Sequence, residues 1–113
     1  MLLIALLLTK HFLADFPWQT QWMVKDKATS LTTLVSHGLV HALLTLGVIG
    51  VCTGTWRSDI AMLELIVHCT IDVIKAQSKR PPSDPRFWTL LGLDQWAHHM
   101  SYVGIALYLG AGG

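Results

Sequence analysis

Residues 10–23 read KHFLADFPWQTQWM, and they directly follow an apolar run, MLLIALLLT, at residues 1–9. The apolar run is typical of a membrane-spanning helix, but Lys10, His11 and Asp15 enter it before it has ended. Because ionisable residues are costly inside a bilayer, those found there usually serve a function. The run lacks a basic first region and a small-residue cleavage site, so we expect no signal peptide here.

The composition predicts a single membrane-embedded domain over residues 1–113. Hydrophobic residues make up 52% of the chain and charged residues 13%, whereas soluble domains carry about 25% charged residues. The formal net charge is +1 and no long basic run is present, so we expect no nucleic-acid partner. Cys52 and Cys69 are far apart in the chain and are expected to be small core residues.

Four apolar segments predict four helices, at about 1–16, 31–54, 59–77 and 88–111. Each is apolar nearly all round, which favours a membrane span over a soluble amphipathic helix. We therefore predict an all-α fold, a four-helix transmembrane bundle with up-down-up-down topology. The first segment is short for a span, at about 24 Å against the roughly 30 Å of the bilayer core. A soluble four-helix bundle is the alternative.

Loop charges predict the orientation in a bacterial inner membrane. The first and third loops are basic, whereas the second has only Arg57, offset by Asp59. We expect the basic loops in the cytoplasm and both termini in the periplasm. The basic residues are Lys25 and Lys27 in the first loop, Lys79, Arg80 and Arg86 in the third, and Lys75 just before it. Trp18, Trp22, Trp56 and Trp88 fall at the expected interfaces.

Each predicted helix carries one pair of metal-ligand residues spaced four apart. This spacing places both members of a pair on one helix face, one turn apart. All four pairs are expected in the cytoplasmic half of the bundle, where they can converge on its axis. The pairs are His11 and Asp15, His37 and His41, His68 and Asp72, and Asp94 and His98.

The pairs repeat along the chain at an offset of 57 residues. His11 matches His68, Asp15 matches Asp72, and the other two pairs match likewise as His37 with Asp94 and His41 with His98. We infer a duplicated helical hairpin, with repeat one at 1–56 and repeat two at 58–113. Two spans in each repeat give both copies the same orientation, related by a pseudo-twofold axis along the membrane normal.

The eight residues predict a site for a divalent transition metal. Three carboxylates left unpaired in a bilayer would cost of order 8–10 kcal/mol, as much as a domain's whole stability. Imidazole with carboxylate suits zinc best among the candidates, which also include iron, manganese and nickel. One or two ions are possible, and eight ligands fit a two-metal site better than a one-metal site. We place Asp15, Asp72, Asp94 and His37 in a layer nearer the cytosol, and His11, His41, His68 and His98 in a deeper layer.

Two other cofactor assignments fit the sequence less well. A carboxylate-bridged di-iron bundle needs several Glu residues, and the sole Glu, Glu64, is expected outside the cluster. A haem held between two histidines would leave the paired Asp residues without a role.

These motifs resemble a known family. The stretch HFLADFPWQTQWM, then His-x-x-x-His, His-x-x-x-Asp-x-x-Lys and LDQWAHH, resembles DUF3307, a family of small integral membrane proteins of phages and bacteria. The arrangement is also similar to bacterial membrane-bound metal-dependent hydrolases. More distantly it resembles zinc-dependent phospholipase C and P1-type nucleases, which cleave phosphoesters, although this chain lacks their N-terminal Trp ligand. That resemblance implies metal-ligand roles for His11, Asp15, His68 and Asp72.

The first functional hypothesis is a metal-dependent hydrolase that acts on a phosphoester lipid or lipid-linked phosphate at the cytoplasmic leaflet. The layer rich in Asp would hold the catalytic ion, with Asp15, Asp72 and Asp94 as catalytic residues, one of them a general base. Two further groups of residues are expected around the catalytic ion, and His99 is expected to lie outside the site. Lys10, Lys75 and Arg86 are candidates for attracting a phosphate, and Gln19 and Gln95 for orienting the ligands.

Two other classes of function stay open. The first is transport of a divalent ion or of protons, for which Asp and His inside a membrane are the usual marks. A homodimer formed through Gly104 and Gly110 would supply the missing outer part of a pathway. The second is a structural metal site in a non-enzymatic phage membrane factor.

Overall fold

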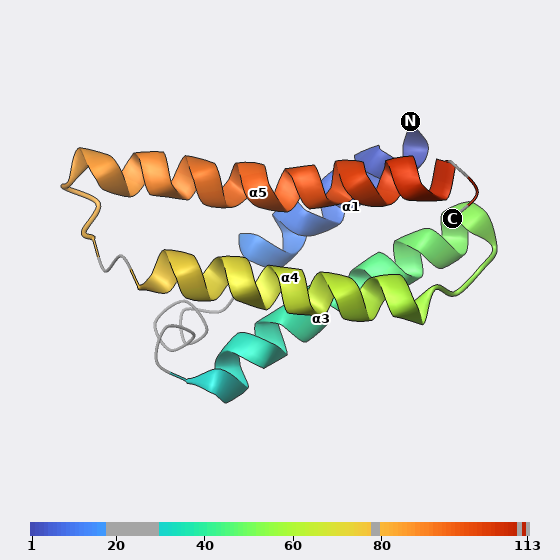
Figure 1. Ribbon diagram of the computed structural model, residues 1–113, viewed down its shortest axis with the longest axis horizontal. Coiled ribbons are helices and arrows are strands. Elements are labelled where there is room, and N and C mark those ends of the chain that lie inside the picture. The colour runs from blue at the N-terminus through green and yellow to red at the C-terminus, as the bar shows by residue number, and fades with distance from the viewer. Residues whose placement is uncertain (18–29, 78–79, 111, 113) are drawn as a thin grey trace.

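A computed structural model describes residues 1–17, 30–77, 80–110 and 112 of the chain. Within these ranges the fold is helical, with no strand, and consists of four helices (Figure 1). They are α1 (Leu2–Asp15), α3 (Leu31–Thr53), α4 (Ser58–Ala76) and α5 (Pro85–Gly110). The predicted all-α fold with four helices is therefore confirmed. Some residues for which the sequence makes a prediction lie outside the described ranges, namely Trp18, Gln19, Trp22, Lys25, Lys27 and Lys79.

Local sequence signals set the ends of the helices. The Ser30 side chain accepts a hydrogen bond from the backbone N–H of Thr33 and so caps the start of α3. Gly54 ends α3 in the left-handed conformation, at φ 73°, and its N–H donates to the carbonyl of Gly50. The last helix begins at Pro85, three residues earlier than predicted. Proline suits the first helical position because its missing N–H has no partner there in any case.

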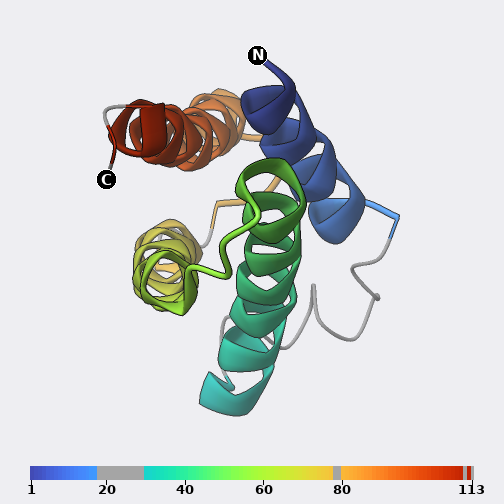
Figure 2. The ribbon, with the colours of Figure 1, turned by 90° about the vertical axis from the view of Figure 1, so that its right-hand side faces the viewer.

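The four helices form a ring in which each packs against two neighbours, in the order α1, α3, α4, α5 and back to α1. Figure 2 shows α4 and α5 nearly end-on, with α1 and α3 inclined to them. In Figure 1 both chain ends lie at the same end of the bundle as the α3–α4 turn, and the α4–α5 connection lies at the opposite end. This arrangement agrees with an up-down-up-down topology.

A close approach between α3 and α4 depends on Gly38. A Cβ atom at this position would lie 2.7 Å from Sγ of Cys69 and 2.9 Å from Cδ1 of Leu65. Glycine therefore lets the two helices pack side by side at the depth of the polar residues. Cys69 and Cys52 are both free thiols and only half-buried, rather than fully in the core as expected.

The distribution of polarity is inverted relative to a soluble domain. Among the described residues, eleven buried side chains are polar or charged, and eight are hydrophobic. Large apolar side chains instead face outward on every helix, including Phe12 on α1, Leu43 on α3, Ile66 on α4 and Leu107 on α5. Soluble monomers rarely expose extensive apolar surface.

Length and composition alone identify α3 as the one described helix suited to cross a membrane. The 14 residues of α1 reach only about 21 Å at 1.5 Å per residue. Charged side chains along α4, such as Glu64 and Asp72, reduce its apolar character. The four-span transmembrane bundle therefore stays a prediction.

Candidate metal centre

All eight predicted ligand residues lie in one polar interior, because the four-residue spacing directs each pair toward the bundle axis. The five histidines are at most 1% exposed, and Asp72 and Asp94 are also buried. Asp15 is the most open of the set, with 11% of its side chain exposed. The histidines are His11, His37, His41, His68 and His98.

Four imidazole rings, one from each helix, lie side by side in a closed circuit, each next to two others. The ring centroid of His41 lies 5.1 Å from that of His11 and 3.9 Å from that of His68. The His98 centroid completes the circuit, at 4.3 Å from His68 and 5.1 Å from His11. These are the four residues assigned to the deeper layer. His37, assigned to the other layer, points Nε2 at the carboxylates of Asp15, at 3.1 Å, and Asp72, at 3.8 Å.

Two sets of ligand atoms converge closely enough to hold a metal ion. Within each set, one nitrogen or carboxylate oxygen from every residue lies within 4.8 Å of the others. His68 belongs to both sets. The first set is Asp15, His37, His41 and His68, and the second is His68, Asp72 and His98. Six of the eight predicted residues are thus brought together in these sets, with His11 and Asp94 adjacent to them.

The carboxylate of Asp15 is saturated with hydrogen-bond partners. Its Oδ1 lies 2.8 Å from Nε2 of His41 and 3.1 Å from Nε2 of His37. Its Oδ2 lies 3.1 Å from Nε2 of His11 and 3.3 Å from the side-chain nitrogen of Gln95. A carboxylate has about four acceptor positions, and all of them are directed at a donor here.

The α4–α5 side of the site is less well satisfied. Neither ring nitrogen of His68, nor Oδ1 of Asp94, has a hydrogen-bond partner among the described residues, although all three atoms are fully buried. The shortest approach of His68 Nε2 to a carboxylate is 3.4 Å, to Oδ2 of Asp72. His98 Nε2 lies 3.3 Å from Oδ1 of Asp72 and 3.5 Å from Oδ1 of Asp94.

A buried ion pair, absent from the sequence prediction, lies beside the histidines. Nζ of Lys10 contacts Oε1 of Glu64 at 2.5 Å, and both residues are only 4% exposed. The same ammonium lies 3.1 Å from the hydroxyl of Tyr102 and 3.3 Å from Nδ1 of His41. Tyr102 in turn lies 2.8 Å from Nδ1 of His11. The placement of Lys10 as a phosphate-attracting residue is therefore wrong, because its charge is buried against Glu64.

The helical spacing contains a signal for part of this network. Glu64 lies four residues before His68, and Tyr102 lies four residues after His98. Both positions extend the ligand-bearing stripes by one turn. Lys10 carries no such signal, because it lies beside His11 and about 100° round the helix from it.

Two of the other residues expected near the site, Gln95 and Lys75, contact its ligand residues. Gln95 contacts the site as expected, with Oε1 3.0 Å from Nε2 of His11 and its amide nitrogen 3.0 Å from Oδ2 of Asp94. Lys75 Nζ lies 3.5 Å from the same Asp94 oxygen. His99 stacks edge-on against His11, at 5.2 Å between centroids, and belongs to neither ligand set.

Arg86 lies away from the site and pairs with Asp84 at the start of α5. Hydrogen bonds from the Arg86 guanidinium and backbone, with a further one from Arg80, hold the pKa of the Asp84 carboxyl below its usual value. This ion-paired turn closes the α4–α5 connection. Arg86 is therefore engaged locally rather than directed at the polar interior.

Comparison with known proteins assigns the chain to a family. The family model described as a protein of unknown function (DUF3307) matches residues 2–111. The chain belongs to this family. Searches of the curated proteins and of the solved structures gave no match. The expected likeness to membrane-bound metal-dependent hydrolases is therefore not supported by these comparisons.

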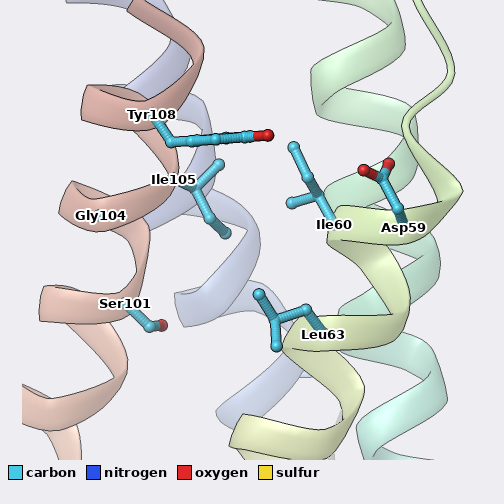
Figure 3. Close-up of a pocket in the computed structure, with 7 residues that line it drawn as sticks. All are labelled: Asp59, Ile60, Leu63, Ser101, Gly104, Ile105 and Tyr108. Carbon is cyan, nitrogen blue, oxygen red and sulfur yellow. The ribbon is translucent and has the colours of Figure 1, made fainter. Parts of the chain in front are cut away.

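In this DUF3307 chain, two apolar grooves follow the seam between α4 and α5. One has a volume of about 250 Å³ and lies at the site, with Lys75 and Asp94 among apolar side chains from both helices, such as Ile74 and Leu93. The other has a volume of about 500 Å³ and lies nearer the chain termini, between Ile60 on α4 and Tyr108 on α5 (Figure 3).

The second groove approaches the polar interior at Ser101, which lines it (Figure 3). The Ser101 hydroxyl donates a hydrogen bond of 2.6 Å to the carbonyl of His98. Gly104 also lines this groove, and a Cβ atom there would meet nothing within 4 Å. The two grooves along the α4–α5 seam of this DUF3307 chain thus reach the part of α5 that carries Asp94 and His98.

Proposed function

We propose that this chain is an integral membrane protein whose four helices enclose a site for a divalent transition metal. The inverted polarity supports the membrane setting, because apolar side chains face outward on all four helices while charged ones lie inside. Among the described residues, Arg80 and Arg86 lie at the α4–α5 connection, opposite the end that holds both termini. The positive-inside rule then puts both termini in the periplasm.

The metal site rests on one observation, the unpartnered buried atoms of His68 and Asp94. Buried polar atoms nearly always have a partner, and leaving one without costs about 1–3 kcal/mol. A cation bound between His68, Asp72 and His98 would satisfy one ring nitrogen of His68, and Oδ1 of Asp94 would lie beside it, 3.5 Å from Nε2 of His98. Imidazole and carboxylate donors favour zinc, with iron, manganese and nickel as alternatives.

The reaction we propose is hydrolysis of a phosphoester lipid, or of a lipid-linked phosphate, at the cytoplasmic leaflet. A bound divalent ion supplies Lewis-acid chemistry, which acidifies water and polarises a phosphoryl oxygen. The free Oδ1 of Asp94 is placed to accept a proton from the attacking water. Asp72 and Asp15 are the other candidate catalytic carboxylates.

The groove at the site supports a lipid substrate. Most of the residues that line it are apolar, as an acyl chain requires, and two charged residues, Lys75 and Asp94, line it as well. The Lys75 side chain is 31% exposed, so it is accessible to an anionic group that enters from the groove. An incoming phosphate would replace the 3.5 Å contact between Lys75 and Asp94.

The test is an assay of detergent-purified protein with vesicles that contain a phosphomonoester or phosphodiester lipid. We expect release of phosphate or of the head group with zinc present, loss of activity with a chelator, and recovery after zinc is restored. Asp94→Asn should abolish this activity, whereas Asp59→Asn should not. Asp59 is a matched control because it lies at the far end of α4, paired with Arg57. A zinc-loaded protein inactive on both lipid classes would contradict the hydrolase proposal.

Proton transfer is a second candidate function, favoured by one specific feature. A chain of hydrogen bonds runs from Glu64 through Lys10 and Tyr102 to His11, and ends at Gln95 and Asp15. Such chains are the usual means of moving protons inside membrane proteins. Proton flux into vesicles that carry the purified protein, lost in Tyr102→Phe, would favour this function over hydrolysis.

A further inference from the structure

The two halves of the polar interior differ in a way that bears on how many ions it holds. Four side chains in the hydrogen-bond network around the ligand residues have a different residue 57 positions away, and in three of the four cases that residue is apolar. The equivalent of Lys10 is Val67, and that of Glu64 is Leu7. Gln95 corresponds to Gly38 and Tyr102 to Thr45. These residues make most of their contacts with His11, Asp15 and His41, the ligand residues of the first half.

We propose that the interior binds one ion, at His68, Asp72 and His98, and that Lys10 and Tyr102 withhold His41 and His11 of the first half from metal. This inference rests on the proposed function and specifies which of the converging side chains hold the ion. It is argued from the direction of the hydrogen bonds and from the spacing of the ligand atoms.

The hydrogen-bond direction at His41 follows from its contact with Lys10. An ammonium group only donates, so Nδ1 of His41, 3.3 Å away, is the acceptor. A neutral imidazole that accepts at Nδ1 carries its proton on Nε2. That atom lies 2.8 Å from Oδ1 of Asp15 and donates to it. A protonated Nε2 has no lone pair for a metal ion.

The same reasoning applies to His11. Nε2 of His11 faces two acceptor oxygens, on Gln95 and Asp15, whereas Nδ1 lies 2.8 Å from the Tyr102 hydroxyl, which can donate to it. Nε2 of His11 then carries the ring proton and donates to Oε1 of Gln95, 3.0 Å away. Both histidines thus present N–H groups rather than lone pairs to the interior.

The distances in the second half are longer than those of short hydrogen bonds and match the edges of a metal polyhedron, and one of the contacts, between Nε2 of His98 and Oδ1 of Asp72, is also a long hydrogen bond of 3.3 Å. His68 Nε2 and His98 Nε2 lie 3.3–3.5 Å from the oxygens of Asp72 and Asp94. Ligand atoms about 2.0–2.1 Å from a tetrahedral zinc are about 3.3–3.4 Å from one another. The corresponding first-half contacts of Asp15 are 2.8–3.1 Å, the usual range of hydrogen bonds.

The number of bound ions is the first test. Elemental mass spectrometry of the full chain, purified in detergent and equilibrated with zinc, should give one equivalent per chain. Two equivalents would overturn this inference and leave the proposed metal site standing. No metal, even after zinc is added, would overturn the metal site itself. The two failures are therefore distinguishable.

A matched pair of variants tests which half binds. Asp72→Asn and Asp15→Asn make the same isosteric change at positions 57 residues apart. We expect Asp72→Asn to weaken zinc binding by at least about 100-fold. Asp15→Asn should weaken it by less than about tenfold, below the roughly 10–100-fold loss of residues that orient metal ligands directly, because Asp15 contacts His11, His37 and His41 instead. Equal losses would overturn the inference. If circular dichroism shows either variant to be misfolded, His98→Gln and His41→Gln form the second matched pair.

A double variant tests the role of Lys10. Lys10→Met with Glu64→Met removes the ion pair without leaving a buried charge, and it frees Nδ1 of His41 to carry the ring proton. A second equivalent of zinc in this variant would support the assigned role. A single equivalent, in a variant shown by circular dichroism to be folded, would overturn the role of Lys10 in excluding the second ion.

Discussion

Lys10 and Glu64 form an ion pair with both side chains nearly excluded from solvent, at 5% and 2% exposure. The pair joins α1 to α4, helices that do not follow one another in the chain. Removing one partner of a buried pair leaves the other charge without compensation, which is more damaging than removing both.

We therefore expect Lys10→Met to destabilise the protein by about 3–5 kcal/mol. The Lys10→Met/Glu64→Met double variant should recover most of this loss, because no charge then stays buried. Thermal unfolding in detergent, followed by circular dichroism, measures both. A double variant as unstable as the single one would show that the contacts of Lys10 with Tyr102 and His41 matter more than the ion pair.

Gly38 should be intolerant of even a methyl group. Gly38→Ala would place Cβ 2.7 Å from Sγ of Cys69, and we expect a cost of about 1–3 kcal/mol from the forced separation of α3 and α4. Gly47→Ala is the control, since a Cβ there meets nothing within 4 Å. It should be neutral or stabilising by up to about 1 kcal/mol, through helix propensity alone. Adding Cys69→Ala to Gly38→Ala should restore part of the loss.

Stability should fall in acid through Asp84. Its carboxyl pKa is lowered in the folded protein by Arg86 and Arg80 from the ordinary value of 3.8. A lowered folded-state pKa contributes stability above pH 3.8, and this contribution is lost as the pH falls toward the folded-state value. Asp84→Asn should reduce stability at neutral pH and flatten this acid-side dependence. Melting temperatures of both proteins across the acid range measure the effect, and parallel pH profiles would contradict it.

The membrane topology is testable by cysteine labelling in a Cys52→Ala/Cys69→Ala background. A hydrophilic maleimide should label Thr55→Cys in intact cells and Ser83→Cys only after the inner membrane is permeabilised. Ile66→Cys should resist the reagent in both cases and react only in denaturing detergent, although the Ile66 side chain faces outward at 61% exposure. Labelling of Ile66→Cys in permeabilised cells, where the protein is still folded, would favour a soluble bundle.

Helical periodicity was sufficient to predict which ligand residues meet. A spacing of four places His11 with Asp15 and His68 with Asp72 on single helix faces. When four helices pack in a ring, such polar faces point toward the axis of the bundle. Helix ends were predicted less well. The predicted segment begins at residue 88, whereas α5 begins at Pro85, because proline is a favoured first residue of a helix.

The partners of the ligand residues were harder to predict. A lysine ten residues into an apolar run reads as an interfacial charge, and nothing local shows that Glu64, 54 residues further on, neutralises it. Pairing across that distance depends on the order of the helices round the ring. The hydropathy pattern is equally incomplete, since length and composition identify only α3 among the described helices as a candidate span.

The Lys10–Glu64 pair also has a consequence for biosynthesis in the proposed membrane setting. A ribosome completes Lys10 well before Glu64, so α1 emerges with a charge that has no partner yet. Such a helix, with 14 residues, is not expected to settle in the lipid interior by itself. Its insertion would wait for α4, so a helix translated before α4 would reach its final depth only after α4 is made.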